Sequence, residues 1–211
     1  MRAGLAVVTT VIVLAGGGLA LRSWPSAGQP SSPARRSSLH AAPAADLNAF
    51  NQATGLRLPE RYAAEVLPHD RPGVVVFLKA DCECSREFAR MVAEAASQLA
   101  TAASCLVVIE GDAAAADAFL ADTKLSTPTL VEGDSRLAAA WSIAKAGCVA
   151  LVRPDRSVEA IWPGISRQGF RDLAARLGPE VALSSDLLER LPGAAMAGCP
   201  LAPVRLVSPE D

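Results

Sequence analysis

Aromatic side chains are scarce in this 211-residue sequence, at 4%, although hydrophobic residues make up 51%. Alanine and other small side chains must therefore fill much of the core, and the apolar content is ample for one domain of ordinary size. A basic surface is also lacking, since the formal net charge is −2. Because proteins that hold nucleic acid need clustered positive charge, we set a nucleic-acid partner aside.

Cysteine is also sparse. The sequence has only Cys82, Cys84, Cys105, Cys148 and Cys199. Five cysteines are too few to build a disulfide-stapled scaffold of this length. The odd number leaves at least one thiol unpaired or shared with a partner. We expect Cys105, inside an apolar run, to be a core residue, whereas Cys199 is either free or paired with another thiol.

An uncharged apolar run occupies residues 3–21. As a helix it is just long enough to span a hydrocarbon core, and it lacks the polar face of an amphipathic core helix. Residues 1–21 are therefore predicted to be a signal anchor or signal peptide, which places the protein on the periplasmic or cell-surface side of a membrane. Arg22 and Trp24 resemble interface anchors and favour an uncleaved segment, whereas cleavage would give a secreted protein.

Three further regions follow. Residues 22–45, rich in Ser, Pro, Ala and Gly, are predicted to be a flexible linker. A folded domain is predicted over residues 46–178, and a C-terminal tail with one short helix, otherwise irregular, over residues 179–211. Apolar periodicity predicts strands over 73–78, 105–109, 129–131, 148–152 and 158–162, and helices within 46–66 and over 85–100, 113–121, 135–143, 170–177 and 186–191.

Alternating strands and helices that end in a hairpin predict an α/β fold. Its central mixed β-sheet should be flanked by helices on both faces, after the N-terminal transmembrane or signal helix. The two innermost strand runs are apolar on both faces, as buried strands are.

The segment VVVFLKADCECSREF, residues 74–88, resembles the active-site segment of thioredoxin-like proteins, especially the membrane-anchored TlpA/ResA and MauD types. Residues 129–164 add to the resemblance, which covers about 46–178. It implies a thioredoxin-like fold and a thiol–disulfide oxidoreductase that needs no cofactor. Protein thiols and disulfides would be its substrates, and a membrane-bound electron donor is a candidate partner.

Two departures from this family stand out. The family motif is Cys-x-x-Cys; Cys82 matches its first cysteine, but Ser85 stands at the second position, and Cys84 instead gives an atypical Cys-x-Cys. The family's cis-proline position falls on Gly147 or Cys148, where no proline is present. Ser85 is expected to be a helix N-cap.

The predicted catalytic residues are Cys82, Cys84 and Cys148. A helix that begins near Ser85 should lower the pKa of Cys82, although the flanking acidic residues oppose this effect. Cys84 could pair directly with Cys82 in a strained disulfide. Alternatively, Cys148 would pack beside the Cys82 loop and act as the resolving thiol.

Two other function classes remain open. Cys82, Cys84 and Cys148 could supply three thiolates to Cu(I) or Zn(II). A degenerate thioredoxin domain could instead serve as a non-catalytic docking protein, as the two departures suggest. A peroxiredoxin is less favoured, because Val75 and Lys79 occupy the positions of its peroxide-activating residues.

Overall fold

The computed structural model describes residues 40–41, 55–63, 67–68 and 70–201. All of them belong to one compact unit, Arg36–Asp211. The predicted anchor over residues 1–21 lies outside the described residues, as do residues 42–54 of the predicted linker and lead-in helix. Within the described ranges, none of the helices has the length and apolar character needed to cross a membrane.

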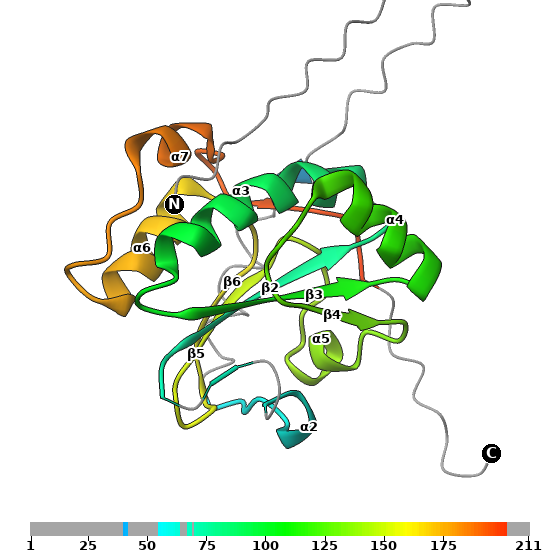
Figure 1. The fold of residues 1–211 in the computed structure, drawn as a ribbon, viewed down its shortest axis with the longest axis horizontal. Coiled ribbons are helices and arrows are strands. Elements are labelled where there is room, and N and C mark those ends of the chain that lie inside the picture. The colour runs from blue at the N-terminus through cyan, green and yellow to red at the C-terminus, as the bar shows by residue number, and fades with distance from the viewer. Residues whose placement is uncertain (1–39, 42–54, 64–66, 69, 202–211) are drawn as a thin grey trace, which may run out of the picture. The chain divides into compact units, whose positions relative to one another are not determined.

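A five-stranded sheet forms the centre of this unit, in the order β4-β3-β2-β5-β6 (Figure 1). Its strands are β2 (Gly73–Lys79), β3 (Ser104–Glu110), β4 (Thr129–Glu132), β5 (Val149–Val152) and β6 (Val158–Trp162). β2, β3 and β4 run parallel, while β5 is antiparallel to both β2 and β6. The predicted mixed sheet is therefore confirmed.

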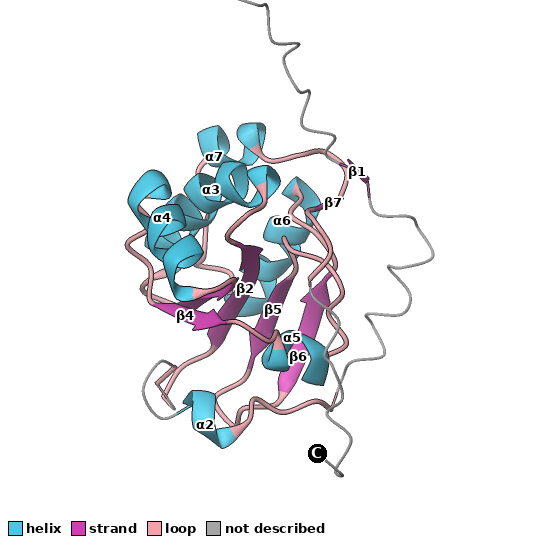
Figure 2. Cartoon of the chain, turned by 90° about the vertical axis from the view of Figure 1, so that its right-hand side faces the viewer, coloured by secondary structure: helices cyan, strands magenta, loops and turns pink. Residues whose placement is uncertain are grey.

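Helices cover both faces of the sheet, as Figures 1 and 2 show. One face carries α3 (Glu83–Leu99), α4 (Ala113–Thr123), α6 (Arg167–Leu177) and α7 (Ser185–Arg190), and the other carries α2 (Glu60–Ala63) and α5 (Arg136–Ala140). Their bounds lie close to those expected, except that α5 ends before residue 141. In the lead-in region only α2 is described.

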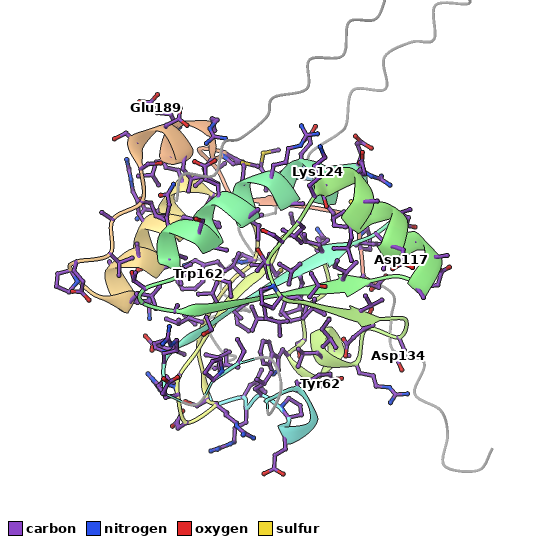
Figure 3. All side chains as sticks on the ribbon, in the orientation of Figure 1. Tyr62, Asp117, Lys124, Asp134, Trp162 and Glu189 are labelled. Atoms are coloured by element: carbon purple, nitrogen blue, oxygen red, sulfur yellow. The ribbon has the colours of Figure 1, made fainter. Side chains whose placement is uncertain are left out.

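Two hydrophobic cores result from the alternation of side chains along the strands. On β2, Val76 and Leu78 belong to the core beneath α3, while Val75 and Phe77 belong to the core beneath α5. Figure 3 shows side chains filling the space between the sheet and the helices. Because the inner strands β2, β3 and β5 are buried on both faces, the sheet separates the two cores.

The C-terminal tail is more ordered than the sequence suggests. β7 (Met196–Ala197) pairs antiparallel with β1 (His40–Ala41), which falls inside the predicted linker. The tail then continues in hydrogen-bonded contact with the domain as far as residue 201. The expectation of an irregular tail beyond α7 is therefore wrong for residues 196–197. We call residues 196–201 the tail segment.

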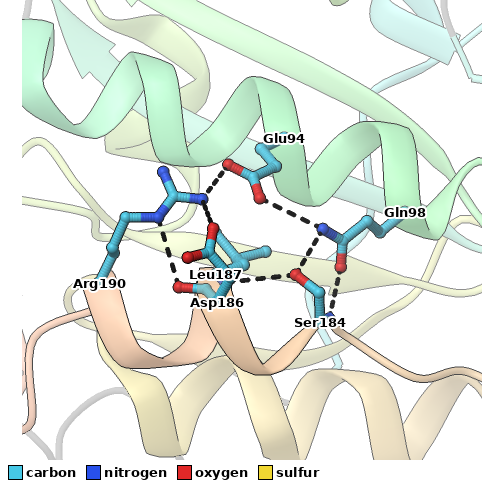
Figure 4. Close-up of polar contacts among 6 residues, drawn as sticks. All are labelled: Glu94, Gln98, Ser184, Asp186, Leu187 and Arg190. Atoms are coloured by element: carbon cyan, nitrogen blue, oxygen red, sulfur yellow. Dashed lines mark hydrogen bonds and ion pairs between the residues drawn. The ribbon is translucent and has the colours of Figure 1, made fainter.

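α7 is fixed to α3 by a polar network (Figure 4). Gln98 donates to the Ser184 hydroxyl at 3.0 Å and accepts from the Ser184 backbone N–H at 2.7 Å. Arg190 forms an ion pair with Glu94 of α3 and a second, at 3.0 Å, with Asp186. The chain therefore leaves α7 from a defined position before it returns to the sheet edge.

Candidate redox site

Cys82 lies in the short loop between the central strand β2 and the helix α3. It is the N-cap residue of this 17-residue helix, with an extended backbone, and its carbonyl accepts from the N–H of Ser85 at 3.0 Å. The loop before Cys82 is short: the backbone N–H of Ala80 still donates to the carbonyl of Glu110 in β3, at 2.9 Å, so strand pairing continues to within two residues of Cys82. The sequence therefore places a thiol at the positive end of a long helix dipole.

Ser85 supports the Cys82 thiol from the first turn of α3. The Ser85 side chain is fully buried, and its hydroxyl oxygen accepts from the backbone N–H of Lys79 at 3.0 Å. The expected N-cap role was wrong, because Cys82 occupies that position. Ser85 instead links the end of β2 to the start of α3, at the position of the family's second cysteine.

The pKa of Cys82 lies below its ordinary value. Burial raises it, but hydrogen bonds from the thiol and backbone N–H of Cys199 and from the backbone and hydroxyl of Ser85 outweigh burial. The Cys199 N–H lies 3.4 Å from the Cys82 sulfur. Direct donors to the sulfur therefore produce the shift that we expected from the helix.

Cys84 follows inside the first turn of α3 and is buried. Burial, the negative charge of Cys82 and a hydrogen bond to Cys82 all raise the pKa of Cys84. Because the two shifts have opposite directions, Cys82 loses its proton before Cys84 as the pH rises.

Cys199 was not identified as a site residue from the sequence. The tail segment carries it to Cys82, from which it is 117 residues distant in the chain. Burial, together with the hydrogen bond to Cys82 and the charge of Cys82, raises the pKa of Cys199 to about 12. The site therefore holds the thiols of Cys82, Cys84 and Cys199, and all are free.

Cys148 lies elsewhere. It belongs to the core beneath α5, whereas Cys82 and Cys84 belong to the core beneath α3, so the sheet lies between them. Its side chain is fully buried, and burial raises its pKa to about 12. The structure thus corrects the expectation that Cys148 packs beside the Cys82 loop, and we assign it no redox role. The other remaining cysteine, Cys105, is half-buried against the core beneath α3.

Gly147, at the family's cis-proline position, has a positive φ of 85°. A side chain there would meet the Phe88 ring at 3.0 Å and the Met196 carbonyl at 3.4 Å. The departure from proline thus coincides with close packing of the tail segment. The described residues contain no cis peptide bond.

Lys79 places a positive charge at the same sheet edge. Its amino group lies 3.2 Å from the carboxylate of Glu110 and donates to the Pro200 carbonyl at 3.0 Å. Burial lowers the pKa of Lys79, but Glu110 more than offsets this and raises it overall. Lys79 therefore remains a cation, and its charge favours a thiolate at Cys199.

Comparison with known proteins concerns the fold. The sequence matches no protein-family model and no curated protein. Among solved structures, the chain is similar to the thiol:disulfide interchange protein DsbE from Chlorobium tepidum, with a TM-score of 0.51 and 13% identity over 59% of this chain and 98% of that chain. The fold is thioredoxin-like.

The chain is also similar to two other solved structures. A secreted Mycobacterium tuberculosis disulfide oxidoreductase homologous to E. coli DsbE gives a TM-score of 0.43 and 17% identity over 53% of this chain and 82% of that one. Peroxidoxin BcpB from the same organism gives a TM-score of 0.47 and 17% identity over 59% and 94%.

The described part of this thioredoxin-like domain offers no group of three or more His, Cys, Asp or Glu side chains arranged to hold a metal ion. The three cysteines suggested from the sequence are divided between the two cores, which explains why they do not form such a group.

Proposed function

We propose that this protein is a thiol–disulfide oxidoreductase that acts on protein cysteines, with Cys82 as its nucleophile. One observation carries the proposal: Cys82 is the N-cap of α3, its pKa is lowered by hydrogen bonds, and other thiols contact it. A thiolate is the reactive form of cysteine, and a second thiol is what releases a mixed disulfide.

The reaction follows from these positions. The Cys82 thiolate attacks one sulfur of a substrate disulfide, a Cys82–substrate bond forms, and the other substrate sulfur leaves with the electron pair and takes a proton. A second protein thiol then loses its proton and attacks the Cys82 sulfur; the Cys82–substrate bond breaks, and the second substrate sulfur leaves with the electron pair and takes a proton. The protein dithiol is thereby oxidised, and the substrate disulfide is reduced. In the reverse direction the same steps oxidise a substrate dithiol.

We further propose that this protein is of the TlpA/ResA/MauD type and acts outside the cytoplasm. The apolar run over residues 3–21 and the segment 74–88 support it. A membrane-bound electron donor is then a suitable partner.

Replacement of Cys82 tests the function. The Cys82→Ser variant should lose turnover of a protein disulfide, such as reduction of insulin with dithiothreitol as donor. Cys105→Ala is the matched control, because Cys105 is half-buried near the start of β3, at the opposite end of the strand from the site. Full turnover in Cys82→Ser would refute the proposal. If a Cys82→Ser/Cys84→Ser double variant also kept its cellular role, the docking alternative would be favoured.

A further inference from the structure

The tail segment covers Cys82. Although Cys82 lies on a strand-to-helix loop, only 1% of it is exposed. The Cys199 N–H donates to its sulfur at 3.4 Å, and the Cys199 carbonyl accepts from the N–H of Ala146 at 2.9 Å. No protein disulfide can reach Cys82 while this segment stays in place.

Backbone hydrogen bonds hold the tail segment on both sides of Cys199. They join it to the loop before β5 and to the turn after β6. These bonds run from Gly198 N–H to Ala146 O (2.7 Å), from Leu201 N–H to Ala144 O (2.9 Å), and in both directions between Met196 and Ile165 (3.0 Å each). Because the bonds are regular and flank the thiol, they fix Cys199 against Cys82.

A glycine shapes the seat of the tail segment. A Cβ atom at Gly164 would lie 2.7 to 3.0 Å from three backbone atoms of Met196, closer than any real contact allows. The φ angle of Gly164 is not positive. Glycine is therefore needed at this position because the tail backbone approaches closely, and not because of the backbone conformation.

We propose that Cys199 is the resolving thiol, carried on a tail segment that opens to admit a substrate disulfide to Cys82 and closes to form a Cys82–Cys199 disulfide. This inference rests on the proposed function and names the thiol that completes it. α7 keeps its place when the segment opens, because its own polar network holds it to α3.

The steps balance as follows. With the segment open, the Cys82 thiolate forms a mixed disulfide with the substrate, which expels its first sulfur as a thiol. When the segment closes, Cys199 gives up its proton to solvent and attacks the Cys82 sulfur. The Cys82–Cys199 bond forms, and the second substrate sulfur leaves with the electron pair and a proton.

The electrostatics favour this order. In the resting site burial, the hydrogen bond to Cys82 and the negative charge of Cys82 together raise the pKa of Cys199. The last two causes disappear once Cys82 is a neutral disulfide sulfur, while the charge of Lys79 still favours the Cys199 thiolate. Cys199 thus loses its proton more easily when there is a mixed disulfide to resolve.

Cys199 can also form a disulfide with Cys82 with less strain than Cys84 can. A Cys82–Cys84 disulfide would close a small ring across one residue, within the N-terminus of a helix, and would be strained. Cys199 comes from a separate segment, so a Cys82–Cys199 disulfide would close no such small ring. We therefore place Cys84 beside the pair rather than in it.

Trapping the intermediates tests the assignment. The full chain is treated with oxidised glutathione, quenched with acid and mapped by peptide mass spectrometry. Wild type should yield a Cys82–Cys199 linked peptide. Cys199→Ser should accumulate the Cys82–glutathione adduct and turn over insulin at least about tenfold more slowly at micromolar free thiol, since a tethered thiol acts at millimolar effective concentration.

The outcomes separate this inference from the proposed function. Wild-type turnover in Cys199→Ser, or a Cys82–Cys84 link alone, would overturn the inference while the loss of activity in Cys82→Ser keeps the function. Activity retained in Cys82→Ser would instead remove both. Cys84→Ser serves as the matched variant and should still form the Cys82–Cys199 link.

A second variant tests the closed segment without changing any thiol. Gly164→Ala should displace the tail segment and raise the rate of Cys82 alkylation by iodoacetamide about fivefold or more, as expected for overpacking. Gly133→Ala is the control, because a Cβ there meets only one atom, at 4.0 Å. Equal Cys82 alkylation in both folded variants and wild type would overturn the idea that the segment gates access.

Discussion

Replacing Ser85 by alanine should lower the stability of the domain and raise the pKa of Cys82. The Ser85 hydroxyl is fully buried and accepts from the Lys79 backbone N–H at 3.0 Å. Its loss leaves that buried donor without its partner, so Ser85→Ala should lower the free energy of unfolding by about 1–3 kcal/mol. For a chain of this size each kcal/mol corresponds to roughly 2–4 °C in melting temperature.

The same substitution should raise the pKa of Cys82, because the Ser85 hydroxyl also hydrogen bonds to its sulfur. The ultraviolet absorbance of thiolates measures this directly. The other four cysteines all have raised pKa values, so Cys82 gives the first titration step as the pH rises. In Ser85→Ala this first step should move to higher pH, and the later steps should stay in place.

The sign of the effect on stability follows from linkage. Since folding lowers the pKa of Cys82, its thiolate contributes stability that is complete above the ordinary pKa of about 9.0 and is lost as the pH falls through the folded value. Ser85→Ala reduces this contribution. The difference in unfolding free energy between wild type and variant should therefore be larger at alkaline than at acidic pH.

Ser97→Ala provides the matched control, because Ser97 lies on the same helix and is exposed. Its effect on stability should stay within about 0.5 kcal/mol. A first thiolate step in Ser85→Ala at the wild-type pH would refute the hydrogen-bond account of the Cys82 pKa. An unchanged melting temperature would show that the Lys79 N–H finds another partner.

Two further predictions concern access. Cys148 is fully buried with a pKa raised to about 12, so native protein at neutral pH should leave it unalkylated by iodoacetamide, whereas urea-unfolded protein should react there; peptide mapping that found rapid native modification would contradict its placement. If residues 3–21 export the domain, a membrane-impermeant amine reagent added to cells with an intact cytoplasmic membrane should label the exposed Lys124; labelling only after lysis would contradict export.

Local sequence patterns determined the secondary structure and the position of the first thiol. The run of apolar residues in β2 followed at once by helical periodicity in α3 leaves only a short loop, so Cys82 must lie at the start of a helix. Its lowered pKa could be expected for the same reason. The order of strands and helices was likewise sufficient for an α/β sheet with helices on both faces.

The partner of Cys82 could not be found in this way. Cys148 was considered because the thioredoxin resemblance put it beside the Cys82 loop. Side chains alternate between the faces of a sheet, however, and Cys148, just before β5, belongs to the core on the face opposite that of Cys82. Because successive side chains point to opposite faces, an error of one residue in the expected position of Cys148 along the strand is enough to place its thiol on the wrong face.

Cys199 shows what only the tertiary structure decided. Nothing near it in the sequence has helical or strand periodicity, and its tail contains the glycine and proline that usually mark irregular chain. Its contact with Cys82 depends on backbone pairing with residues 144–146, more than 50 positions away. The sequence therefore determined where a reactive sulfur lies, because that follows from neighbouring residues; which thiol faces it required long-range pairing that backbone hydrogen bonds alone specify.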